Sequence, residues 1–71
     1  MKRLYELKRG DKIRIMEDLP EPKEIMLTFD HVDGSYSYST TSDGRVCHLA
    51  AYTPLKKVNG HYEIIEDKEG K

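Results

Sequence analysis

The sequence predicts an all-β fold, a small antiparallel barrel of five to six strands with a single 3-10 turn. Turn-forming residues divide the 71-residue chain at short intervals, and the pieces between them are only about five to eight residues long. Several pieces alternate apolar and polar residues or are rich in β-forming residues. Pieces of this length suit strands and are too short for ordinary helices.

The first two strands are expected over residues 12–16 and 25–32. In the first strand, Ile13 and Ile15 lie on one face because side chains alternate along a strand. The segment between them, residues 17–24, holds two prolines and four acidic residues. We therefore expect an exposed loop there rather than a tight hairpin.

The next strands are expected over residues 35–40 and 45–49, the first of which alternates strictly between small polar and larger residues. Residues 50–53 are too few for an α-helix and end at a proline, so they predict the 3-10 turn. Residues 54–58 and 61–65 complete the predicted set. The predicted core is Leu7, Ile13, Ile15, Leu27, Phe29, Val46, Leu49, Leu55 and Val58.

Three turns carry the residues that hairpins require. The Asp-Gly pair at 33–34 and the Asn-Gly pair at 59–60 suit type I′ turns, in which both central positions need positive φ. The Ser-Asp-Gly sequence at 42–44 suits a slightly longer hairpin with glycine in the left-handed position. The second, third and fourth strands are therefore expected to form an antiparallel meander.

This order of elements resembles that of SH3-like small β-barrels, and the resemblance covers about residues 8–58. Residues 8–15, with the Gly-Asp step before a strand, also resemble the opening of KOW-type modules. The resemblance implies one SH3-like barrel domain over residues 1–65. The remaining residues, 66–71, are almost all charged or glycine and are expected to be a disordered tail.

Residues 28–38 and 48–54 look similar to small uncharacterised proteins of tailed bacteriophages. That resemblance implies a phage-encoded protein that acts in the host cytoplasm by occupying a surface of a larger protein.

The composition limits where such a protein could work. Cys47 is the only cysteine, so no intramolecular disulfide can form and a reducing, cytoplasmic location is expected. No apolar run approaches the roughly 20 residues of a membrane span, and no signal peptide is visible, so we expect no membrane association.

The net charge is −1, but the charges are unevenly distributed. Residues 1–14 hold six basic and two acidic residues, whereas residues 17–33 hold six acidic residues and one basic residue. Tight binding to random nucleic acid is therefore not expected. A KOW-like nucleic-acid-binding barrel remains the alternative, with Lys8, Arg9 and Lys12 as candidate contacts to phosphate or to an acidic partner.

The residues with chemical potential do not suggest a metal site or an enzyme. Cys47 and His48 are adjacent and should point to opposite faces of a strand, and the spacing of His31 and His61 adds no close ligand pair. Asp30 and His31 are also expected to face apart. No nucleophile motif or phosphate-binding loop is present in the sequence, so neither catalysis nor a cofactor is expected.

The tyrosines suggest a different function. Tyr36 and Tyr38 share one face of their strand, and Tyr52 follows the next strand directly. We expect these three rings to form an exposed patch with His31 and His48 as neighbours, which is the profile of an interface. The sequence thus predicts a small non-enzymatic interaction module that binds a protein partner. Its oligomeric state is open, and a homo-oligomer that assembles through an exposed edge strand is a third hypothesis.

Overall fold

A computed structural model describes residues 2–17 and 20–65 of the chain. Within these residues one seven-stranded sheet and one short 3-10 helix form the regular structure, which confirms the all-β class. The predicted tail at residues 66–71 lies outside the described part. The elements are β1 (Lys2–Arg3), η1 (Leu4–Glu6), β2 (Lys12–Glu17), β3 (Lys23–Asp33), β4 (Tyr36–Thr40), β5 (Val46–Ala50), β6 (Pro54–Val58) and β7 (His61–Ile64).

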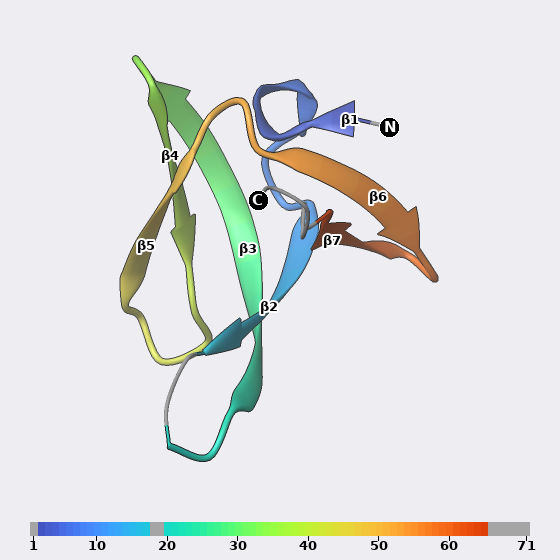
Figure 1. The fold of residues 1–71 in the computed structure, drawn as a ribbon. Coiled ribbons are helices and arrows are strands. Elements are labelled where there is room, and N and C mark those ends of the chain that lie inside the picture. The colour runs from blue at the N-terminus through green and yellow to red at the C-terminus, as the bar shows by residue number, and fades with distance from the viewer. Residues whose placement is uncertain (1, 18–19, 66–71) are drawn as a thin grey trace.

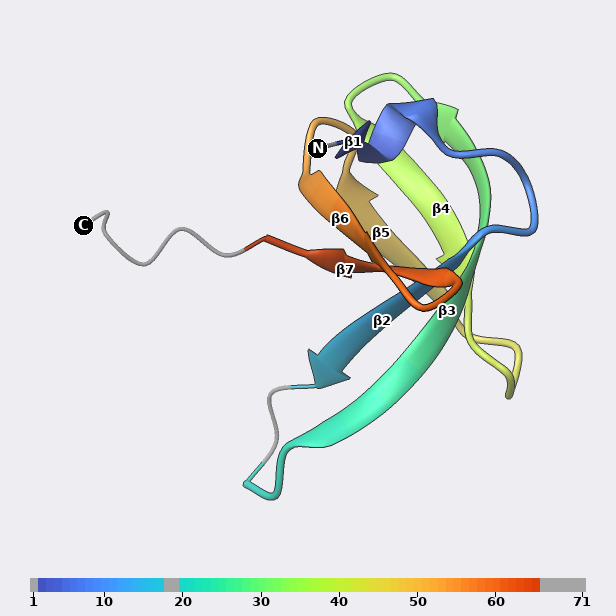
Figure 2. The ribbon, with the colours of Figure 1, turned by 90° about the vertical axis from the view of Figure 1, so that its right-hand side faces the viewer.

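The sheet has the strand order β1-β6-β7-β2-β3-β4-β5 and curls into a half-barrel (Figures 1 and 2). Neighbouring strands are antiparallel except β2 and β7, which are parallel. Seven strands form where five to six were predicted, because the chain start adds the two-residue strand β1 beside β6. β1 and β5 are the two edges of the sheet.

Two of the predicted turns form as expected. Asn59 and Gly60 both have positive φ, 49° and 90°, between strands β6 and β7 that pair directly before and after them. This is the type I′ arrangement. Gly44 adopts a φ of 90° in the loop between β4 and β5, which confirms its left-handed position.

The turn between β3 and β4 differs from the prediction. Asp33 pairs with Tyr36, so the two central residues are Gly34 and Ser35 rather than Asp33 and Gly34. Gly34 has a φ of 69°, whereas Ser35 has no positive φ. Glycine in the first central position alone corresponds to a type II′ turn, so the hairpin is shifted by one residue from the expected register.

The 3-10 segment was also predicted in the wrong place. It lies at η1, before the first long strand, and not at residues 50–53. Ala50 remains in β5 opposite Tyr36, and the following reversal is a single turn in which the Thr53 N–H donates to the Ala50 C=O at 3.1 Å. A single hydrogen bond of this kind closes a turn, whereas a 3-10 helix repeats it at successive residues.

The inner face of the half-barrel holds the core. Its buried cluster is Leu4, Leu7, Ile13, Leu27, Phe29, Leu55 and Tyr62, and Ile15 and Leu49 pack against it half-buried. Val58 is only half-buried and lies outside this cluster. The prediction that Val46 is in the core is wrong, since its side chain is 53% exposed. Val46 and Leu49 are three residues apart on one regular strand, so they must face opposite sides.

Candidate binding face

Strand β4 divides its side chains sharply between the two faces of the sheet. Ser37 and Ser39 are fully buried on the inner face, and the Ser37 hydroxyl donates to the Leu49 carbonyl at 3.0 Å. Because successive side chains alternate, Tyr36 and Tyr38 face outward. Tyr36 is 59% exposed and Tyr38 is half-buried.

Three rings form a continuous row across the outward face of β3, β4 and β5. Tyr38 lies opposite His31 on one side and opposite His48 on the other. The His31 and Tyr38 rings are stacked, with centroids 4.7 Å apart and planes 6° from parallel, and His48 meets Tyr38 edge-on at 4.5 Å. We call His31, Tyr38 and His48 the aromatic row.

A β-bulge shapes one end of this row. The register of β3 and β4 shifts between Phe29 and His31, which leaves Asp30 as the extra residue. The prediction that Asp30 and His31 face apart is therefore wrong, because the bulge breaks the alternation and Asp30 Oδ2 lies 2.5 Å from His31 Nδ1. This hydrogen bond lowers the pKa of Asp30, and the nearby positive charge of Arg9 lowers it further.

Arg9, in the loop before β2, is connected to the aromatic row through Asp30, which bonds to His31. Arg9 Nε lies 3.2 Å from Asp30 Oδ1. Lys12 Nζ instead donates to Thr28 Oγ1 at 2.9 Å, and the side chain of Lys8 is exposed. Of the three predicted phosphate contacts, Arg9 and Lys12 thus already have partners on β3.

The two remaining predicted residues, Tyr36 and Tyr52, lie outside the aromatic row. Tyr36 lies two residues before Tyr38 on β4, on the same outward face, and pairs with Ala50. Tyr52 is 66% exposed in the turn after β5, and the Ala51 N–H holds that turn to the Ser35 carbonyl at 2.8 Å. Within residues 2–17 and 20–65, the contacts between two rings involve only His31, Tyr38 and His48.

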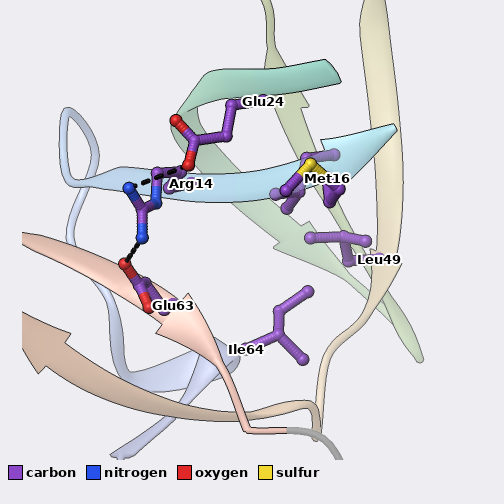
Figure 3. A pocket seen from close by; sticks show the side chains of 7 residues that line it. Arg14, Met16, Glu24, Leu49, Glu63 and Ile64 are labelled. Carbon is purple, nitrogen blue, oxygen red and sulfur yellow. Dashed lines mark hydrogen bonds and ion pairs between the residues drawn. The ribbon is translucent and has the colours of Figure 1, made fainter. Parts of the chain in front are cut away.

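The open side of the half-barrel contains a cleft that the sequence did not predict. It measures about 340 Å³ and lies between β2, β5 and β7 (Figure 3). Its lining consists of Arg14, Ile15, Met16, Glu24, Leu49, Glu63 and Ile64. These residues come from strands that are distant in sequence, so no local sequence motif could predict the cleft.

The charges at the mouth of the cleft pair with one another. Arg14 Nη1 lies 3.0 Å from Glu24 Oε2, and the other end of the guanidinium contacts Glu63 (Figure 3). His61 Nε2 is 3.1 Å from the same Glu63 oxygen. The bond to His61 and the charge of Arg14 lower the pKa of Glu63, which favours the ionised, paired form of this carboxylate. The lining of the cleft thus combines the two ion pairs of Arg14 with the apolar side chains of Ile15, Met16, Leu49 and Ile64.

Cys47 and the histidines do not assemble a metal centre. Within the described ranges, no group of three or more His, Cys, Asp or Glu side chains is arranged to hold a metal ion. Cys47 is a free, half-buried thiol on the inner face, opposite Ser39. Residues 2–17 and 20–65 contain no helix with the length and apolarity that crossing a membrane requires.

Comparison with known proteins identifies no relative of this chain. No protein-family model matches the chain, and no curated protein or solved structure is significantly similar to it.

Proposed function

We propose that the chain is a non-enzymatic interaction module that binds a protein partner through the outward face of β3, β4 and β5. The observation that carries this proposal is the aromatic row, with the exposed Tyr36 ring beside it on the same face. Tyrosine rings at interfaces combine a large apolar contact area with a hydroxyl that tolerates water.

The row is held in place before any partner arrives. Imidazole rings flank the Tyr38 ring on both sides, and the Asp30 carboxylate fixes the His31 ring. A side chain that is already ordered loses little conformational entropy on binding, so more of the contact energy becomes affinity. Arg9 and Asp30 supply the polar rim that surrounds the core of most interfaces.

The proposal includes an SH3-like barrel class, a phage origin and a cytoplasmic site of action. The order of the elements, the likeness to small phage proteins and the single cysteine support these three points. On this view the module acts by covering a surface of a larger host or viral protein.

Nucleic-acid binding is the second candidate, and one observation favours it. Arg9 lies at the end of a row of rings, and stacked rings beside basic side chains are typical of surfaces that bind single strands. However, Asp30 stands between Arg9 and His31, and a carboxylate there would repel a phosphate. Protein binding is therefore the stronger proposal.

The test compares the wild-type chain with Tyr38→Ala in affinity capture from the native host, followed by quantitative binding to each captured protein. Tyr38→Ala should weaken binding by about 2 kcal/mol or more, as expected for the centre of an interface. Met26→Ala is the matched control, because Met26 is 43% exposed on the same sheet but pairs with Arg14, away from the row. Circular dichroism checks that both variants fold.

Two results would count against the proposal. One is a partner whose affinity survives both Tyr38→Ala and the double variant Tyr36→Ala/Tyr52→Ala. The other is a gel shift with duplex DNA or RNA that weakens steeply with salt and disappears when Lys8, Arg9 and Lys12 are replaced together, which would favour nucleic acid.

A further inference from the structure

Strand β5 is an edge with unpaired backbone groups. The Thr41 N–H donates to Arg45 and the Ala51 N–H donates to Ser35, which marks both as hydrogen-bonded pairs of the β4–β5 ladder. Hydrogen-bonded and non-hydrogen-bonded pairs alternate in an antiparallel ladder. The backbone groups of Val46 and His48 therefore point away from β4, where the described part of the chain provides no strand.

The sequence of β5 lacks the residues that protect edge strands from pairing with another strand. β5 contains no Asp, Glu, Lys, Arg, Pro or Gly, which are the residues that commonly protect edge strands. Its outward side chains include Val46, a β-branched residue that is 53% exposed. On the inner face, Cys47 and Leu49 are half-buried, and Leu49 borders the cleft between β2, β5 and β7.

We propose that β5 pairs antiparallel with β5 of a second copy of this chain, about a two-fold axis at Cys47. This register places Val46 opposite His48 of the second copy and His48 opposite its Val46. It uses only backbone groups that have no strand partner within residues 2–17 and 20–65. A register centred on His48 would instead require the Ala50 carbonyl, which already accepts from Thr53.

The charges fit a second copy. Self-pairing of β5 brings no like charges opposite one another, since the strand has no charged residue and the next pair would oppose Arg45 to Leu49. The other edge of the sheet behaves differently, because self-pairing of β1 would oppose the basic residues Lys2 and Arg3 to their own copies. The dimer also covers the exposed Val46 side chain and extends the outward sheet face, so the two aromatic rows lie on one surface.

Sedimentation velocity over a concentration series in reducing buffer tests the dimer. The wild-type chain should shift from monomer to dimer as its concentration rises. Val46→Lys adds a charge to the edge and should raise the dimer dissociation constant about tenfold or more. Met26→Lys adds the same charge to an exposed position of the interior strand β3 and should leave the dimer unchanged. His48→Pro, which removes an edge-facing N–H, should act like Val46→Lys.

The register has its own test. The two Cys47 residues form a non-hydrogen-bonded pair, whose Cα atoms are about 4.5 Å apart, within the range that a disulfide spans. Diamide, which accepts two electrons and two protons from two thiols, should therefore link the chains rapidly into a dimer, and Cys47→Ser should abolish the link.

Three results would overturn the proposal. The first is a wild-type chain that stays monomeric at the highest soluble concentration. The second is a dimer that Val46→Lys and His48→Pro leave intact. The third is a dimer in which diamide does not link Cys47. Loss of the dimer in folded Val46→Lys, with partner capture unchanged, would support the dimer and show that it is separate from the proposed partner binding.

Discussion

The two edges of the sheet are built in opposite ways. β1 is two residues long, both of them basic, and it leads directly into η1, where Leu4 is fully buried. Hydrogen bonds then attach this edge to the turn between β5 and β6. The Leu4 N–H donates to the Thr53 carbonyl at 2.9 Å, and Arg3 Nη1 donates to the Tyr52 carbonyl at 3.0 Å. β5 is five residues long, without charge, and β4 is its sole strand neighbour within residues 2–17 and 20–65.

The difference indicates which edge of the sheet can accept a further strand and which cannot. An edge that is short, basic and anchored in the core is poorly suited to pair with another strand. An edge that is longer and uncharged leaves both backbone hydrogen bonds and the exposed Val46 side chain available to another strand. The same edge carries His48 of the aromatic row, so the open side of the sheet and the proposed binding face meet at β5.

The largest expected effect concerns the anchored edge. Leu4→Ala should destabilise the chain by about 2–5 kcal/mol, because it leaves a cavity at a fully buried position. Val46→Ala at the open edge should change stability by no more than about 0.5 kcal/mol at a concentration where the chain is monomeric. Urea unfolding measures both. Similar losses from the two substitutions would show that the edges are not different in kind.

The next effect concerns the turn that holds β5 to β4. Gly44→Ala should cost about 1–2 kcal/mol, because alanine is strained at a φ of 90°. A Cβ at this position would meet no other atom within 4 Å, so the cost is that of the backbone alone. Ser42→Ala in the same loop is the control and should have little effect on the urea midpoint. An unchanged midpoint for Gly44→Ala would mean that the loop adopts another conformation in solution.

A smaller effect separates the two buried serines on the inner face of β4. Ser37 donates to Leu49, whereas the Ser39 hydroxyl is buried with no hydrogen-bond partner in the described structure. Ser37→Ala should cost about 1 kcal/mol, while Ser39→Ala should be neutral or stabilising, because it removes an unsatisfied polar group. Thermal unfolding of the two variants compares them directly. Equal destabilisation would indicate that Ser39 finds a partner in solution.

The smallest effect needs no substitution. Amide hydrogen exchange followed by NMR at low concentration should be faster at Val46 and His48 than at Cys47 and Leu49, because only the latter two donate to β4. Raising the concentration should slow exchange at Val46 and His48 if β5 pairs with a second copy. Strong protection of these two amides at the lowest concentration would show that the chain covers its own edge.

The sequence by itself determined six of the seven strands, the antiparallel meander, the turn at Asn59 and Gly60 and the left-handed position of Gly44. Alternation and turn chemistry act over a few neighbouring residues, which is why the adjacent pair Asn59 and Gly60 is enough to predict a type I′ turn. The same alternation required Tyr36 and Tyr38 to share a face. Applied to β5, it would also have excluded Val46 from the core once Leu49 was placed there.

Tertiary structure decided the features that depend on partners distant in sequence. The bulge that joins Asp30 to His31 arises from the pairing of β3 with β4, and the burial of Leu4 arises because β1 pairs with β6, more than 50 residues away. The cleft likewise needs β2, β5 and β7 together. Which face of β4 points inward, and which edge of the sheet stays open, follow from how the whole sheet curls around its apolar residues, and no short stretch of sequence contains that information.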